Sequence, residues 1–171
     1  MTPGYVIPSP LGDIVLRVED DWLTGLFFVG QKYFPQRISP MQIQGGTPPL
    51  VRQAQHQVNE FFSGERRVFT VPLGLRGTSF QRQVWKELAA IPYGTLTSYG
   101  EIAKRLGLAT HHARAVGSAV GHNPVSVIVP CHRVVSMSGD LTGYAGGIDR
   151  KAALLALEKC SNVPASPRVL R

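Results

Sequence analysis

Cysteine is scarce in this sequence, because only Cys131 and Cys160 occur among 171 residues. Two cysteines are too few for a disulfide scaffold, although a single bridge between them remains possible. No CxxC pair is present, which excludes a cysteine-based zinc site. His111 and His112 cannot both face one ligand from a helix, so a solvated or phosphate-facing pair is the simpler interpretation. We therefore expect neither a metal nor a cofactor.

Long apolar runs are also missing. No segment approaches the ~20 residues that a membrane-spanning helix needs. Residues 1–5 show no basic segment followed by an apolar stretch, as a secretory signal would. With 17% charged and 43% hydrophobic residues, the composition is that of a folded globular protein. We expect a cytoplasmic protein without a membrane partner, associated with the nucleoid if its source is a prokaryote.

Acidic residues are few in the second half of the chain. Residues 1–78 hold seven Lys or Arg against six Asp or Glu, whereas residues 79–171 hold eleven against five. A basic half indicates a polyanionic partner, with nucleic acid as the first candidate. A surface that only keeps the protein soluble explains the same excess, and charge alone does not decide between the two.

The first part of the chain, residues 1–75, has the pattern of a small α/β domain. Two apolar runs, 13–18 and 22–29, are separated by two aspartates and predict a β-hairpin. Apolar residues then recur every three or four positions over 50–64, as in an amphipathic helix. The segment 67–75 predicts another strand. We find no recognisable chemistry in this domain.

The second part, residues 76–171, has the pattern of a helical domain. Two candidate capping boxes precede apolar stripes that predict helices over 78–91 and 98–106. After a three-residue turn, Thr110 can cap a third helix over 111–120. This is the spacing of a helix-turn-helix, although many helical hairpins share it.

The third predicted helix has two contrasting faces. Ala113, Val116 and Val120 form an apolar face that can pack into the core. The other face combines one long cation with very small residues: Arg114, Gly117, Ser118 and Gly121. Because Gly inside a helix costs up to about 1 kcal/mol, this face indicates close approach to a DNA groove or to another helix. Arg114 favours DNA, since an arginine is costly at a tight apolar contact.

Cys131 follows a buried apolar run over 125–129, which we interpret as a strand. A thiol reacts as its thiolate, so a reactive cysteine needs a nearby base or positive charge. His132 and Arg133 are candidates for these roles, although neighbouring side chains in a strand point apart and a turn or bridging water would be needed. The alternative is a buried cysteine beside a chance histidine.

Several motifs together favour the reactive cysteine. They are Arg-Ala-Val-Gly at 114–117, Asn-Pro-Val at 123–125, Pro-Cys-His-Arg-Val at 130–134, Gly-Tyr-Ala-Gly-Gly at 143–147, and the residues Tyr99, Lys151 and Glu158. In this order and spacing, they resemble the O6-alkylguanine-DNA alkyltransferases, the methylated-DNA–protein-cysteine methyltransferase family. The resemblance covers most of residues 78–158; the N-terminal half is similar only in its architecture.

The resemblance implies an α+β fold. A ribonuclease-H-like N-terminal domain would precede a mostly helical domain with a winged helix-turn-helix that binds the minor groove of double-stranded DNA containing O6-alkylguanine. Arg114 would fill the gap left by a flipped nucleotide, and Tyr99 would crowd the target phosphate. The DNA-binding set that the resemblance implies is Tyr99, Ala113, Arg114, Ala115, Gly117 and Ser118. We expect a monomer, and cooperative binding to DNA stays open.

The resemblance also implies a mechanism. Cys131 would attack the alkyl carbon of O6-alkylguanine, and of O4-alkylthymine as well, while His132 takes the thiol proton through water. Glu158 would orient the imidazole, and the Tyr99 hydroxyl would protonate the departing guanine. The pocket and its turn would involve Asn123, Val134, Tyr144, Ala145, Gly146 and Lys151, with backbone groups around Val134 and Ala145 reading the base. The thioether product is stable, so each molecule reacts once.

Some features depart from the family pattern. One extra residue lies near 108–110, Ala145 stands where Ser is frequent, and the cysteines of an N-terminal zinc site are absent. Two other functions stay open: a DNA-binding module that binds alkylated DNA without reacting, and a cysteine hydrolase built on Cys131 and His132. We expect Cys160 to be inert.

Overall fold

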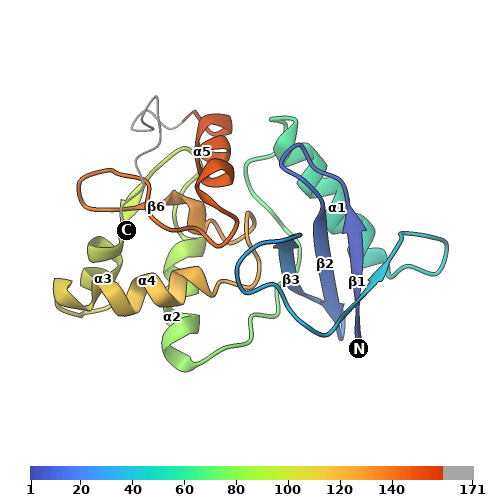
Figure 1. The fold of residues 1–171 in the computed structure, drawn as a ribbon, viewed down its shortest axis with the longest axis horizontal. Helices are drawn as coiled ribbons and strands as arrows, with labels where there is room; N and C mark the ends of the chain where they lie inside the picture. Colours follow the sequence, from blue (N-terminus) through green and yellow to red (C-terminus); the bar gives the residue numbers. More distant parts are fainter. Residues whose placement is uncertain (160–171) are drawn as a thin grey trace.

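The structure is a computed structural model and describes residues 1–159; Cys160 lies outside the described residues. A sheet and one helix form the N-terminal half, and helices are the main regular elements of the C-terminal half (Figure 1). The strands are β1 (Thr2–Ile7), β2 (Ile14–Glu19), β3 (Trp22–Phe28) and β4 (Ile38–Met41), in the order β3-β2-β1-β4. β1 runs antiparallel to β2 and parallel to β4, and β2 runs antiparallel to β3.

The predicted hairpin is confirmed as β2 and β3. Asp20 and Asp21 lie between the strands with φ of 50° and 63°. A two-residue turn with positive φ matches the right-handed twist of the strands, and aspartate tolerates that conformation. β1 and β4 were not predicted, because Pro3 and Pro40 weaken the sequence pattern of a strand.

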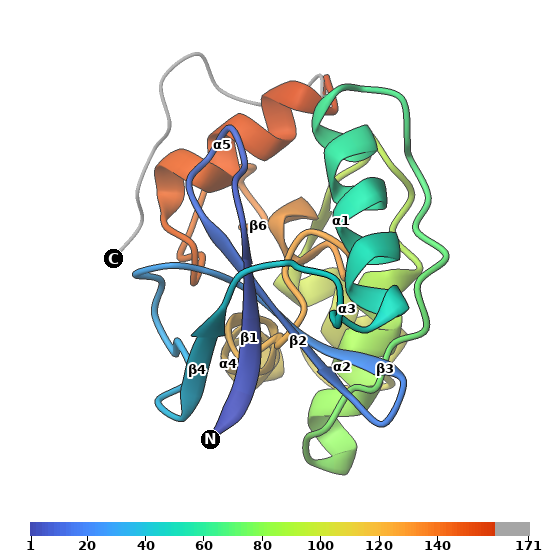
Figure 2. The same ribbon diagram turned by 90° about the vertical axis from the view of Figure 1, so that its right-hand side faces the viewer.

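The predicted helix of this domain is confirmed as α1 (Pro49–Phe62), which packs against β2 and β3 (Figure 2). The strand predicted over 67–75 is wrong. This segment runs beside β3 with a single bridge between Leu23 and Leu73, where Leu23 N donates to Pro72 O at 2.9 Å and Gly74 N donates to Leu23 O at 2.9 Å. Pro72 has no N–H of its own, so the ladder does not extend.

The helices predicted over 78–91 and 98–106 are confirmed as α2 (Ser79–Ala89) and α3 (Tyr99–Arg105). Thr78 and Gln81 complete a reciprocal capping box on α2. The third helix differs from the prediction, because residues 110–112 form a 3-10 turn, η1 (Thr110–His112), before α4 (Ala113–Gly121) begins. The side chain of Thr110, which we expected to cap this helix, is outside the described part of the structure.

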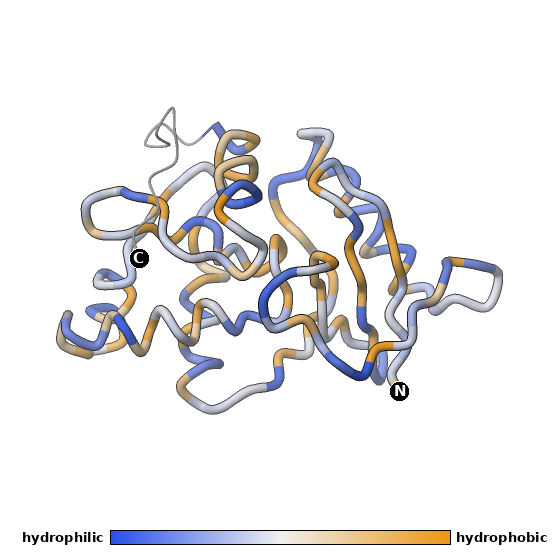
Figure 3. The backbone as a smooth tube through the Cα atoms, viewed as in Figure 1, coloured by the Kyte–Doolittle hydropathy of each residue, from blue (hydrophilic) through white to orange (hydrophobic). Residues whose placement is uncertain are grey.

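Three further elements complete the C-terminal half. β5 (Thr97–Ser98) pairs in parallel with β6 (Val134–Val135), a 3-10 turn η2 spans Cys131–Arg133, and α5 spans Ile148–Leu157. One continuous core joins both halves, and hydrophobic residues concentrate along the strands and inner segments (Figure 3). Within residues 1–159, no helix combines the length and apolar character needed to cross a membrane.

Candidate active site

A mostly buried loop, residues 122–130, carries the chain from α4 to Cys131. The strand predicted over 125–129 is wrong, because Val127 adopts a φ of 72° and only Val125 bridges to β3, at Leu26. Leu26 N donates to Pro124 O at 2.9 Å, and Ser126 N donates to Leu26 O at 3.2 Å. An apolar run therefore identified the burial of this segment and not its conformation.

Asn123 holds this loop from within. Its Nδ2 donates to Val129 O at 2.8 Å, and its Oδ1 accepts from Val125 N at 3.0 Å. The side chain is buried, so these bonds satisfy groups that water cannot reach. The amide thereby closes the turn that leads to Cys131.

The Cys131 side chain is only 4% exposed and begins the 3-10 turn η2. Burial raises the pKa of the thiol, and the opposing effects of Asn123, the Lys151 charge and Ser126 do not cancel this rise. The residue therefore rests as a thiol at neutral pH and needs a base before it can act as a nucleophile. Sequence reasoning missed Ser126, whose only signal is a lone hydroxyl in an apolar run.

His132 and Glu158 are in contact although 26 residues separate them. His132 Nε2 lies 2.7 Å from Glu158 Oε2, and both side chains are buried. Burial lowers the pKa of His132 against the opposing effect of Glu158, which favours a neutral imidazole. With the proton on Nε2 facing the carboxylate, Nδ1 is left as the acceptor, and it has no hydrogen-bonding partner among the described residues.

Glu158 is held by more than the histidine. Arg133 donates to it twice, from Nε and Nη2 at 2.8 Å each, and Gly94 N donates at 3.2 Å. Burial would raise the pKa of Glu158, but the bonds and charges of His132 and Arg133 lower it to about 2. Glu158 is thus a carboxylate throughout the physiological pH range.

Arg133 does not provide the positive environment for the thiol that we expected. Besides Glu158, its guanidinium donates to Ile91 O at 2.6 Å and lies 5.6 Å from the centre of the Tyr93 ring. The cation that acts on Cys131 is Lys151, which is fully buried. Burial lowers the pKa of Lys151 to about 8, while the charge of Cys131 opposes this shift.

Two tyrosines lie on the Lys151 side of the site. The Tyr99 hydroxyl accepts from Thr142 Oγ1 at 2.8 Å, its ring centre is 6.0 Å from Lys151 Nζ, and burial raises its pKa. The Tyr144 hydroxyl is buried near Ser126 and Cys131 without a well-formed hydrogen bond to any described residue, and burial and then Cys131 raise its pKa well above the usual value.

The solvent-facing side of α4 is small and carries one cation. Arg114, Ala115 and Ser118 are exposed, and Ala113 and Gly117 are half-buried. A Cβ at Gly117 would lie 3.7 Å from the Tyr99 ring, so this face reaches the site. The opposite face packs into the core through Val116, Val120 and Ala119, a residue that sequence reasoning did not include.

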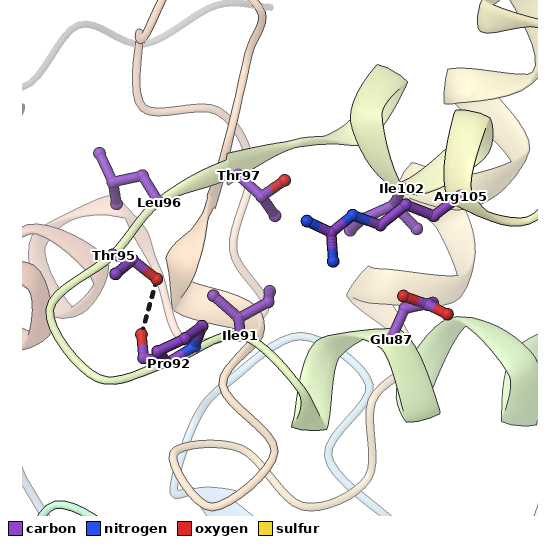
Figure 4. Close-up of a pocket in the computed structure, with 8 residues that line it drawn as sticks. All are labelled: Glu87, Ile91, Pro92, Thr95, Leu96, Thr97, Ile102 and Arg105. Carbon is purple, nitrogen blue, oxygen red and sulfur yellow. Dashed lines mark hydrogen bonds between the residues drawn. The ribbon is translucent and has the colours of Figure 1, made fainter.

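No group of three His, Cys, Asp or Glu side chains within residues 1–159 could hold a metal ion. A separate small pocket lies between α2 and α3, where Glu87 and Arg105 point toward the same space (Figure 4). Thr95 Oγ1 donates to Pro92 O at 2.8 Å at its rim. None of the candidate site residues lines this pocket, so it is distinct from the Cys131 site.

Both halves of the chain match known families. The family model for the ribonuclease-like domain of 6-O-methylguanine DNA methyltransferase matches residues 5–75, and the model for its DNA binding domain matches residues 79–160. A methylated-DNA–protein-cysteine methyltransferase of Mycobacterium tuberculosis is 51% identical over 159 residues, which is 93% of each chain. The constitutive enzyme of that name from Bacillus subtilis is 38% identical over 154 residues, 90% of this chain and 93% of the other.

Solved structures agree with this similarity. The crystal structure of Mycobacterium tuberculosis OGT in complex with DNA has a TM-score of 0.82 to this structure at 47% identity. The match covers 95% of this chain and 96% of that one. The likeness therefore extends over both halves of the molecule.

Proposed function

This chain belongs to the 6-O-methylguanine DNA methyltransferase family, and we propose that Cys131 is the residue that receives the alkyl group. The protein is a DNA-repair methyltransferase that transfers an alkyl group from DNA to its own cysteine. Its substrate is O6-alkylguanine in double-stranded DNA, with O4-alkylthymine as a further substrate. The observation that carries this proposal is a buried hydrogen bond: His132, which follows Cys131 in the chain, contacts Glu158, and all three residues are buried.

The reaction is a displacement at the alkyl carbon. The Cys131 sulfur forms a bond to that carbon as the carbon–O6 bond breaks, and the thiol proton passes through water to Nδ1 of His132. Glu158 stabilises the imidazolium that forms and fixes the ring with its proton on Nε2. Arg133 acts mainly through Glu158, to which it donates two hydrogen bonds, and its charge also helps to keep His132 neutral. The thioether is not hydrolysed, so the protein acts once.

The departing guanine needs a proton on its ring. Because Thr142 Oγ1 donates to the Tyr99 hydroxyl, the proton of Tyr99 is free for another acceptor. Tyr99 therefore protonates the base, while the buried charge of Lys151 favours the thiolate on the same side. Both groups lie where negative charge develops during the transfer.

Backbone groups around Val134 and Ala145 would read the guanine edges, but two of them are already engaged. The Val134 N–H donates to Cys131 O within η2, and Ala145 O accepts from Lys32 N at 2.9 Å. The Ala145 N–H is the group in the loop 143–147 that we assign to the base. Alanine at this position suits a backbone contact, because no side-chain group is required.

DNA binds along the exposed face of α4. Its small residues allow close approach to the minor groove, and the excess of positive charge in residues 79–171 attracts the phosphates. Arg114 enters the base stack and occupies the place of the flipped nucleotide, whose extrusion costs a few kcal/mol. The protein acts as a monomer in this proposal.

Intact-protein mass spectrometry tests the function directly. The wild-type protein and Cys131→Ser are each mixed with a duplex that contains one O6-methylguanine, and an unmodified duplex serves as the control. We expect a single methyl increment on Cys131 in the wild type alone, with DNA binding preserved in the serine variant. Binding without any increment would indicate a non-catalytic module, and turnover of an ester substrate would indicate a hydrolase.

A further inference from the structure

The N-terminal domain contacts the loop 143–147, here called the pocket loop, at three places. Lys32 N donates to Ala145 O at 2.9 Å from the turn that follows β3. Phe28 packs against Gly146, since a Cβ on that glycine would lie 3.3 Å from the phenyl ring. Arg150 of α5 makes the third link, because its guanidinium donates both to Leu11 O in the N-terminal domain and to Gly146 O in the pocket loop.

The Arg150 guanidinium joins parts of the chain that are far apart in sequence. Its Nε donates to Leu11 O at 2.9 Å, in the turn between β1 and β2, and its Nη1 donates to Gly146 O at 3.0 Å. The guanidinium carbon lies 4.7 Å from the centre of the Phe28 ring, a cation–π distance. One planar group thus ties the pocket loop to two segments of the sheet domain.

The pocket loop has little freedom to compensate for a loss of this tie. Gly146 is buried between Tyr144 and Phe28. A Cβ at this position would lie only 2.7 Å from the Tyr144 ring, so only glycine fits there without a shift of that ring. Gly147 N donates to Tyr144 O at 2.8 Å and closes a turn at the start of α5. The hydroxyl of Tyr144 lies near Cys131 and Ser126 without a well-formed hydrogen bond to any described residue, so the backbone of this loop contributes to its placement.

We propose that Arg150 is a positioning residue that holds the pocket loop against the N-terminal domain and so sets the guanine-binding geometry beside Cys131. This inference rests on the proposed function. It also assigns a task to the N-terminal domain, which contributes no candidate catalytic side chain. A fixed two-donor guanidinium suits the task, because it can satisfy two carbonyls and a ring face at once.

The test compares Arg150→Met with a matched control, Arg17→Met. Arg17 is likewise half-buried, donates to a carbonyl (Thr24 O, 2.8 Å) and lies 5.2 Å from the centre of a phenyl ring, that of Phe27. Its contacts stay within the sheet domain and the adjoining Arg76, so it shares the chemistry without touching the pocket loop. Both variants are assayed for methyl uptake from free O6-methylguanine base, which requires no DNA contact.

We expect Arg150→Met to raise the half-saturating concentration of the free base about tenfold, the scale of one lost charge-assisted hydrogen bond. The shape of the rate–pH profile should stay as in the wild type, because His132 and Glu158 do not contact Arg150. Arg17→Met should leave the half-saturating concentration unchanged. Arg150→Lys, with a point charge in place of the fork, should resemble the methionine variant within about threefold.

An unchanged half-saturating concentration in Arg150→Met, an equal rise in Arg17→Met, or full rescue by lysine would each overturn the proposal. If Arg150→Met does not fold, Arg150→Lys is measured instead, and an unchanged half-saturating concentration in that variant would overturn the proposal. Amide hydrogen exchange gives a second readout without substrate: exchange in residues 143–147 should be faster in the Arg150 variants and unchanged in Arg17→Met. If the wild type takes up no methyl group, the proposed function fails, and this exchange measurement still decides the role of Arg150.

Discussion

The two sides of Cys131 are built differently. On one side, Glu158 accepts hydrogen bonds from His132, Arg133 and Gly94, all at 3.2 Å or less. On the other side, among residues 1–159, Lys151 Nζ has only a long contact of 3.4 Å to Thr142 O, and the Tyr144 hydroxyl forms no well-formed hydrogen bond, although Ser126 and Cys131 are near it. Both sides are polar and buried, yet only on the first do short hydrogen bonds from the protein hold the charged group, and the one open acceptor there is Nδ1 of His132.

This difference separates structure from reactivity. A satisfied ionic network keeps its geometry and loses much stability when one member is removed. Buried polar groups with weak partners are costly in the free protein, and they are expected where a substrate supplies the missing partner. We therefore regard the Glu158 side as the permanent base and the Lys151 side as the surface completed by the guanine.

Glu158→Gln tests this contrast most strongly. The amide cannot balance Arg133 or an imidazolium, so we expect methyl transfer to slow about 100-fold or more and the free energy of unfolding to fall by about 3 kcal/mol. Stopped-flow transfer assays and urea unfolding measure the two effects. Glu65→Gln, at an exposed carboxylate, is the control and should change neither. An unaltered rate would remove Glu158 from the catalytic set.

Arg114→Ala should leave both sides of the thiol intact. We expect slower repair of duplex DNA, with an activation free energy raised by up to a few kcal/mol, the scale of base unstacking. The reaction of the free base should change little. A mismatch opposite the lesion should restore part of the rate. Arg82→Ala, an exposed arginine on α2, is the matched control. An equal loss with free base and duplex would make Arg114 a folding or pocket residue.

Lys151→Met should make the protein more stable and yet slow methyl transfer, whereas Glu158→Gln should lower both stability and rate. Removal of a buried cation without a carboxylate partner should raise the free energy of unfolding by about 1 kcal/mol. The same change removes the charge that favours the thiolate, and methyl transfer should slow about tenfold, the effect of one pKa unit. A destabilised variant with a normal rate would show that Lys151 is a structural residue.

The remaining prediction is a pH dependence of stability. The pKa of Lys151 is about 8 in the folded protein against 10.5 when exposed, so the unfolded state binds more protons between these values. Stability should therefore rise with pH from about 8 to 10.5 through this residue. Subtracting the unfolding curve of Lys151→Met from that of the wild type at each pH isolates this contribution. If this difference in unfolding free energy does not change with pH, the ammonium of Lys151 lies in a solvated environment.

Much of the fold followed from local patterns. The hairpin, α1, α2 and α3 were predicted because their turns, caps and apolar stripes depend on residues close in sequence. The segments 67–75 and 125–129 were predicted as strands and are not, since an apolar run indicates burial while a strand needs a partner along its length. β1 and β4 were not predicted, because pairing with neighbouring strands makes them strands more than their own residues do.

The sequence by itself determined the elements of the site: a cysteine next to a histidine, a distant glutamate, a lysine, and a helix with a small basic face. Only the tertiary structure decided their environment. It directed Arg133 to Glu158, brought Lys151 to the thiol, and joined Arg150 to a carbonyl 139 residues away. Sequence motifs record which groups are present, whereas pKa and orientation depend on burial and on contacts between remote segments, which exist only once the chain has folded.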